Sequence, residues 1–163
     1  MVSIKAEDKV NVLFITVDDM NWDSVGAYGC KISEITPSID SLASGGMRFE
    51  HAYVQSPNCS PSRNVFQSGR YPHTSGMRGF FNVHADFKTL PEVLMDNGYF
   101  TGVVNKAMDT SLTAEFDKYW NYIAKSDAVE KRGAATYGKG LGEVIDKASS
   151  ANKPFYCVVN IAD

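Results

Sequence analysis

The amino-acid sequence predicts an α/β fold built on a sheet of parallel strands. Two observations carry this prediction. Residues 10–17 (VNVLFITV) form a continuous apolar run of strand length that is rich in β-branched residues, and candidate helices and strands then alternate along the chain. The length of 163 residues and the 44% hydrophobic content are those of one ordinary domain.

The run at residues 10–17 is interpreted as a central parallel strand that is buried on both faces, and it leads directly into Asp18 and Asp19. A helix is expected over residues 36–46, because a Thr-Pro pair opens this segment and two glycines close it. Residues 47–54 are predicted to form a second strand.

Residues 56–70 (SPNCSPSRNVFQSGR) predict a short helix beside a cysteine. Ser60 is the expected N-cap, Pro61 the first helical residue and Gly69 the terminator. The free N–H groups at the start of this helix would point at whatever Cys59 faces, and that geometry suits an anion.

The second half of the chain continues the alternation. Residues 71–86 are interpreted as a loop, and residues 105–137 show no clear period. The glycine cluster at residues 138–142 is also interpreted as a loop. The expected elements are a helix from a capping box at residues 89–92 to about residue 97, a strand at 99–104, a helix at 141–148 and a last strand at 155–161.

Charged side chains follow several predicted strands. Asp18, Asp19, Lys106 and Asp163 come just after them, and ligands of parallel sheets bind at the carboxyl ends of the strands. We therefore expect these residues to share one edge of the sheet. The adjacent carboxylates of Asp18 and Asp19 have two interpretations, a solvated turn or a site for a hard cation such as Ca²⁺ or Mg²⁺.

Cys59 is either a packed, inert thiol or a reactive centre, and its small polar neighbours favour the second. Arg63 lies one helical turn further, on the same face. Its guanidinium could grip two oxygens of a tetrahedral oxyanion, although a surface arginine is the simpler interpretation. Lys106 could add a second positive charge.

Composition excludes several classes of protein. The net charge of −3 gives no electrostatic footprint for nucleic acid, and no apolar stretch approaches the ~20 residues of a membrane span. The three cysteines do not suggest a disulfide framework. The first residues lack the apolar core of a signal peptide, so either the protein is cytoplasmic or a signal was removed. The end, directly after a predicted strand, leads us to expect a fragment.

The segment Cys59–Arg63 (CSPSR) resembles the C-x-P-x-R core of the type I sulfatases, within the alkaline phosphatase superfamily. Other blocks resemble this family in the same order along the chain: residues 11–19, 21–22, 26–29, 36–43, 46–49, 68–73, 90–92, 98–102 and 154–163. The core looks most like the heparan N-sulfatase (sulfamidase) branch. The resemblance implies a three-layer αβα fold, with residues 1–163 as the N-terminal portion of a catalytic domain.

The resemblance also implies a chemistry. In this family a separate maturation enzyme oxidises the cysteine, here Cys59, to formylglycine. One hydroxyl of the hydrated aldehyde attacks sulfur, and the other then expels the covalent sulfate. By position, Asp18 and Asp19 would bind Ca²⁺ or Mg²⁺ together with the modified Cys59. Arg63 would support the formylglycine hydrate, and Lys106 would contact the sulfate.

One motif departs from the family, whose second signature reads G-K-x-H where this chain has Asn105-Lys106-Ala107-Met108. The family's other metal ligands, an Asp-Asn pair, would follow residue 163. The expected activity is hydrolysis of a sulfuric ester or sulfamate on a small molecule or sugar. Two alternatives stay open, namely a phosphonate monoester or phosphodiester hydrolase and a non-catalytic metal- or anion-binding remnant. The incomplete sheet also makes self-association an expectation.

Overall fold

The computed structural model describes residues 9–77, 79–81, 83, 85–112, 115–124 and 133–162. The described residues fall into two compact units, Asp19–Val54 and the remainder. The elements in chain order are β1 (Val12–Val17), α1 (Pro37–Gly45), α2 (Cys59–Ser68), α3 (Pro72–Ser75), α4 (Leu90–Asp96), β2 (Phe100–Val104), β3 (Tyr122–Ala124), α5 (Ala134–Ser150) and β4 (Phe155–Ile161), with 3₁₀ helices at Trp22–Ser24, Gly26–Tyr28 and Phe116–Tyr119.

The larger unit is built on a sheet of four strands in the order β1-β4-β2-β3. All three strand pairs are parallel, with Val12 opposite Tyr156 and Phe100 opposite Phe155 in the register. Parallel strands need a crossover connection, and α5 supplies it between β3 and β4, which lie on either side of β2 in the sheet. The α/β class with a mostly parallel sheet is therefore confirmed.

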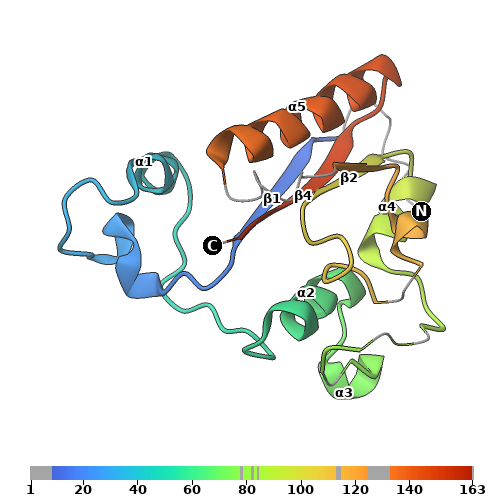
Figure 1. The fold of residues 1–163 in the computed structure, drawn as a ribbon, viewed down its shortest axis with the longest axis horizontal. Helices are drawn as coiled ribbons and strands as arrows, with labels where there is room; N and C mark the ends of the chain where they lie inside the picture. The colour runs from blue at the N-terminus through green and yellow to red at the C-terminus, as the bar shows by residue number, and fades with distance from the viewer. Residues whose placement is uncertain are drawn as a thin grey trace. The chain divides into compact units, whose positions relative to one another are not determined.

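Helices cover both faces of this sheet, as Figure 1 shows, with α5 on one face and α2 and α4 on the other. Alternate strand residues point to opposite faces. Val104, Cys157 and Val159 pack against α5, whereas Val103 and Val158 belong to the apolar cluster of the other face, against which Leu94 of α4 packs. The result is a three-layer αβα arrangement.

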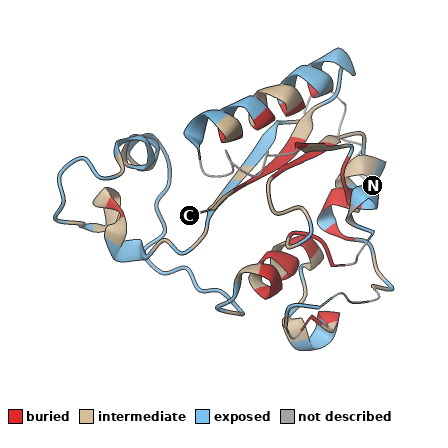
Figure 2. Ribbon diagram, in the orientation of Figure 1, coloured by how far each residue is buried: buried red, intermediate tan, exposed pale blue. Residues whose placement is uncertain are grey.

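The first strand differs from its prediction, because β1 is not buried on both faces. Its residues Leu13, Ile15 and Val17 are 40 to 49% exposed, and Figure 2 shows β1 pale where β4 and β2 are red. Among the described strands, only β4 pairs with β1. An apolar run predicts a buried strand, but burial depends on the elements that pack beside it. Among the described strands, β1 has a neighbour at one edge only.

Two further predictions were wrong because sequence patterns do not show packing partners. Residues 47–54 form no strand; the described part of their unit holds no other strand with which to pair. The glycine cluster at residues 138–142 is not a loop but lies inside α5. A Cβ on Gly140 would stand 2.8 Å from Cγ1 of Val104, so this glycine lets α5 lie close to the sheet.

The remaining elements match or extend the predictions. Thr89 and Glu92 form the expected capping box, with the Thr89 N–H donating to Glu92 Oε2 across 2.7 Å. The region without a clear period contains β3 and a 3₁₀ helix. The loop predicted at residues 71–86 was partly wrong, because these residues include the helix α3. In the smaller unit, Asp40 of α1 accepts a hydrogen bond of 2.7 Å from the N–H of Ala27.

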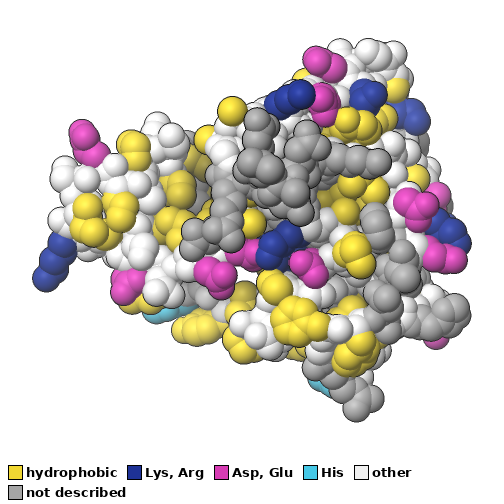
Figure 3. All heavy atoms as spheres, in the orientation of Figure 1, with side chains coloured by type: hydrophobic (Ala, Val, Ile, Leu, Met, Phe, Trp, Pro, Cys, Tyr) yellow, Lys and Arg dark blue, Asp and Glu magenta, His cyan; other side chains and the backbone are white. Residues whose placement is uncertain are grey.

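The surface carries charges of both signs. Basic and acidic side chains are interspersed in the space-filling view (Figure 3), and the net charge of the chain is −3. Of the helices in the described residues, none has the length and apolar character needed to cross a bilayer.

Candidate active site

Helix α2 begins one residue before the predicted N-cap. Asn58, with extended backbone angles, is the N-cap, and Cys59 is the first helical residue. The chain therefore enters the helix at the cysteine itself, and Pro61 becomes the third helical residue. Helical geometry leaves the N–H groups of Cys59 and Ser60 without helical acceptors, while Pro61 has no N–H to leave. The helix ends as predicted, at Gly69 in the left-handed conformation.

Arg63 is not a surface residue, since only 4% of it is exposed. Its side chain runs from α2 to the ends of two strands. Nη2 donates to Asp18 Oδ1 across 2.7 Å and to Thr16 Oγ1 across 3.2 Å, and Nε donates to Asn160 Oδ1 across 3.0 Å. The planar guanidinium is thus fixed by three acceptors: Thr16 on β1, Asp18 just after β1, and Asn160 on β4.

Asp18 lies between two cations. Its Oδ1 accepts from Arg63, and its Oδ2 forms an ion pair with Nζ of Lys106. Only 10% of the Asp18 side chain is exposed. Burial works to raise the pKa of this carboxyl, but the hydrogen bonds from Lys106 and Arg63 outweigh it, so the pKa lies below its ordinary value. The site therefore holds an ionised carboxylate with a net positive surrounding.

Lys106 reaches Asp18 from an unusual backbone. Asn105 and Lys106 both have positive φ angles, of 61° and 50°, and residues other than glycine rarely adopt this region. Asparagine tolerates it better than most, which explains how Asn105 stands where the family signature has glycine. The Oδ1 of Asn105 accepts from the N–H of Lys106 across 2.9 Å and so fixes the strained turn locally.

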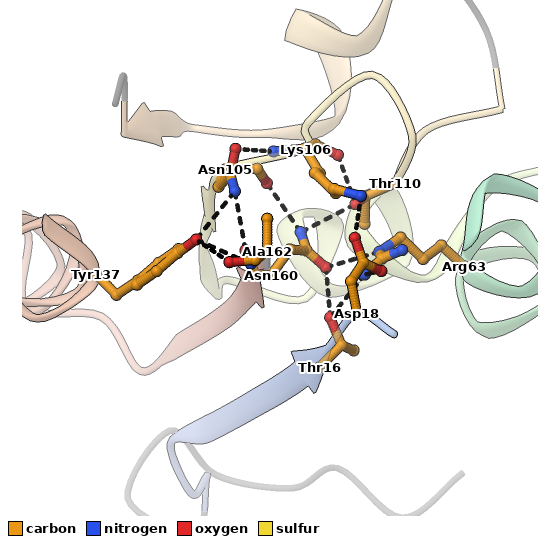
Figure 4. A network of polar contacts seen from close by, with 9 residues as sticks. All are labelled: Thr16, Asp18, Arg63, Asn105, Lys106, Thr110, Tyr137, Asn160 and Ala162. Atoms are coloured by element: carbon orange, nitrogen blue, oxygen red, sulfur yellow. Dashed lines mark hydrogen bonds and ion pairs between the residues drawn. The ribbon is translucent and has the colours of Figure 1, made fainter. Parts of the chain in front are cut away.

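Asn160, near the end of β4, joins these parts into one network (Figure 4). It has no exposed surface. Besides Arg63, it contacts Thr16, Asn105 and Thr110. Sequence reasoning missed this residue. The signal that could have found it is a lone amide inside an otherwise apolar strand, CVVNI, because a buried polar side chain needs partners.

The structure therefore brings some of the site residues predicted from the sequence together, but not all of them. Asp18 and Lys106, which follow β1 and β2, meet at one edge of the sheet as expected, and Arg63 joins them. Cys59 is partly exposed at the start of the same helix, one turn before Arg63. Asp19 belongs to the other unit and has a φ of 55°. Asp163 lies outside the described residues.

The described residues of the site offer the type of donor atom that a divalent cation prefers, but too few of these atoms. The carboxylate of Asp18 is the hard oxygen donor that Ca²⁺ and Mg²⁺ prefer. Ca²⁺ takes about six to eight such oxygens. Within the described part of the chain, no three His, Cys, Asp or Glu residues gather into a metal site. These residues could supply part of a coordination shell, and further oxygen donors would be needed to complete it.

Comparison with known proteins gives a consistent result. Residues 10–159 match the family model described as Sulfatase. The sequence is 34% identical to iduronate 2-sulfatase of Mus musculus over 97% of this chain and 29% of the relative. The chain thus spans less than a third of the length of that relative. These matches do not assign the chain to a particular branch of the family, so the resemblance to the sulfamidase branch stays a prediction.

Solved structures share the fold. BT4656, in complex with its substrate D-glucosamine-2-N,6-O-disulfate, superposes with a TM-score of 0.76 at 21% identity, covering 94% of this chain and 34% of that one. The phosphonate monoester hydrolase of Agrobacterium radiobacter gives a TM-score of 0.68 at 17% identity, covering 94% and 41%. At these identities the similarity concerns the fold alone.

Proposed function

The chain belongs to the sulfatase family, and we propose from this premise that it contributes the nucleophile-bearing part of a sulfuric ester or sulfamate hydrolase. Residues 1–163 would be the N-terminal portion of the catalytic domain. The order of the family motifs and the 29% share of the mouse relative that the chain covers support this assignment.

One observation carries the proposal. Asp18, Arg63 and Lys106 converge at the carboxyl edge of the sheet, and Arg63 lies one turn along α2 from Cys59. Two cations and the start of a helix are groups that can bind a tetrahedral sulfate, and the carboxylate is a donor that can hold a divalent cation beside it. They come from three different segments of the chain, so the fold rather than local sequence brings them together.

Each residue has a proposed role in the reaction. Cys59 is the precursor of the formylglycine, whose hydrate supplies one hydroxyl for attack on sulfur and a second for release of sulfate. Arg63, fixed by its three acceptors, orients the side chain of residue 59. Lys106 donates to a sulfate oxygen and stabilises the charge that develops on it.

Asp18, Asp19 and the modified residue 59 are proposed as ligands of Ca²⁺ or Mg²⁺. When bound, such a cation polarises the sulfate and favours ionisation of the attacking hydroxyl. The ionised state of Asp18, favoured by Lys106 and Arg63, keeps an oxygen donor ready for it. The family's Asp-Asn pair would complete the shell.

The proposed partners follow from the same chemistry. The substrate is a sulfated small molecule or sugar, as the names of the sulfatase relatives suggest. A formylglycine-generating maturation enzyme must act on Cys59 before turnover. A second copy of the chain is a further partner, since β1 presents exposed apolar residues and, among the described strands, pairs on one side only.

A phosphonate monoester or phosphodiester hydrolase is the second candidate, favoured by the fold shared with the Agrobacterium radiobacter enzyme. A non-catalytic remnant is the third, because Met108 replaces the histidine of the second signature. Hydrolysis of a paired aryl sulfate and aryl phosphate separates the three. The first proposal predicts preference for the sulfate, the second predicts preference for the phosphate, and the third predicts turnover of neither.

The assay uses the full-length protein with formylglycine verified at position 59, because the 163 residues alone are expected to turn over little or nothing. Cys59→Ala should abolish sulfate hydrolysis and leave the fold intact. Sulfatase turnover that survives this substitution would refute the proposed mechanism, and robust turnover by the 163 residues alone would contradict the expected need for further ligands.

A further inference from the structure

Asn160 uses both ends of its amide, and each end serves a different part of the site. Oδ1 accepts from Nε of Arg63 across 3.0 Å and from Oγ1 of Thr16 across 2.7 Å. Nδ2 donates to the carbonyl of Asn105 across 2.9 Å and to Oγ1 of Thr110 across 3.1 Å. A primary amide has two acceptor and two donor positions, so every position of this buried side chain is used.

The partners fix the orientation of the amide. Nε of Arg63 can only donate, and the carbonyl of Asn105 can only accept. Asn105 returns the contact, since its own Nδ2 donates to the carbonyl of Asn160 across 3.1 Å. This reciprocal pair joins the end of β4 to the turn in which Asn105 and Lys106 hold positive φ angles. Such a conformation persists only where surrounding contacts determine it.

We propose that Asn160 is a positioning residue that sets Arg63 and Lys106 at a fixed separation across Asp18. Its oxygen holds the arginine, its nitrogen holds the turn that carries the lysine, and the rigid amide links the two. The importance of this separation rests on the proposed function, in which Arg63 orients residue 59 and Lys106 donates to the sulfate that residue 59 attacks. A shift of either cation would misalign the attacking group and the bound sulfate.

A different view is that Asn160 merely satisfies a buried polar core. In that case a substitution of Asn160 would lower the free energy of unfolding, but the site would be unchanged in the molecules that remain folded. One substitution that removes only the donor end of the amide and one that removes both ends separate the two views. Asn160→Asp keeps an acceptor for Arg63 but loses the donor to Asn105. Asn160→Leu loses both.

Thr101→Val supplies a matched control. Thr101 on the neighbouring strand β2 is as completely buried as Asn160. It makes hydrogen bonds to Asn121 and to the carbonyl of Tyr119, away from Asp18 and the two cations. The substitution therefore removes a buried polar group of the same sheet without touching the site.

The experiment measures hydrogen exchange by NMR at Nε–H of Arg63 and at the backbone amide of Lys106, with a titration of inorganic sulfate. All proteins are studied where circular dichroism shows them fully folded. We expect Asn160→Asp to keep protection at Arg63 and lose it at Lys106. Asn160→Leu should lose both and weaken sulfate binding about tenfold, as expected for loss of a hydrogen bond to a charged group. Thr101→Val should change neither.

Protection at Lys106 that survives in folded Asn160→Asp would overturn the proposal, as would unchanged sulfate affinity in folded Asn160→Leu. If Asn160→Leu does not fold, Asn160→Asp, which loses only the donor end of the amide, decides through the protection of the Lys106 amide. If the parent protein binds no sulfate but the two variants show the expected exchange pattern, the positioning role is supported and the proposed function fails.

Discussion

Nη2 of Arg63 donates to Oδ1 of Asp18 across 2.7 Å and so ties helix α2 to the carboxyl end of β1. The two residues are 45 positions apart in the sequence, and both side chains are almost fully buried, with exposures of 5% and 10%. Their contact, with Lys106 on the other carboxylate oxygen, is the centre of the candidate site. The same contact also contributes to the stability of the fold.

Arg63→Ala is predicted to destabilise the protein strongly. The substitution leaves Asp18 buried beside Lys106 alone and removes the Arg63 donors to Thr16 and Asn160. Removing one partner of a buried ion pair typically costs about 3–5 kcal/mol, which urea unfolding would measure. Lys88→Ala is the control, because the ion pair of Lys88 with Asp96 is exposed and its loss should leave the free energy of unfolding almost unchanged. Equal effects would contradict this account.

Lys106→Met is predicted to bind Ca²⁺ more tightly than the parent protein. Lys106 and a bound cation share the carboxylate of Asp18, so removal of the ammonium removes a competitor and a repulsive charge. The gain should be on the order of tenfold for a partly screened pair, and calorimetric titration measures it. Sulfate affinity should fall in the same variant. Weaker Ca²⁺ binding would argue that Asp18 is not a metal ligand.

Much of the fold could be predicted from local pattern. The apolar runs of β1, β2 and β4, the capping box at Thr89 and the terminal glycine of α2 are each determined by neighbouring residues. Parallel pairing then predicted that Asp18 and Lys106 would meet, and they do. The CSPSR motif predicted the family, which the match over residues 10–159 confirms.

What could not be predicted depends on partners that are distant in sequence. The exposure of β1 depends on which strands lie beside it. The burial of Arg63 depends on acceptors from β1 and β4. Asn160 acts through residues from 50 to 144 positions away, and no local spacing encodes such contacts. Gly140 of α5 was misread because its packing against Val104 and Ala124 of the sheet is equally non-local.

Gly140→Ala is predicted to destabilise the protein, whereas Gly138→Ala should stabilise it. Alanine is the better helix former by about 1 kcal/mol. At position 140 its Cβ would meet Val104 and Ala124 at 2.8 and 3.1 Å, and at position 138 it meets nothing within 4 Å. Overpacking costs about 1–3 kcal/mol, so the two variants should shift the thermal midpoint in opposite directions. Equal stabilisation of both would show that α5 does not lie close to the sheet.

Ile15→Lys is predicted to reduce self-association. Ile15 is 49% exposed in the middle of β1, and a lysine on an edge strand opposes pairing with another chain. Val10→Lys adds the same charge at a more exposed position just before the strand, and it should leave association unchanged. Light scattering over a range of concentrations gives the masses. A parent protein that stays monomeric throughout would refute the association.

Mass spectrometry of the peptide from Phe49 to Arg63 tests the central claim most directly. The protein is coexpressed with a formylglycine-generating enzyme, and a peptide of an established sulfatase in the same cells reports that the enzyme is active. We predict that residue 59 carries the mass of formylglycine in place of cysteine, and that Cys59→Ala carries no such change. An unmodified Cys59 beside a converted control peptide would contradict the claim that this cysteine is the precursor of the nucleophile.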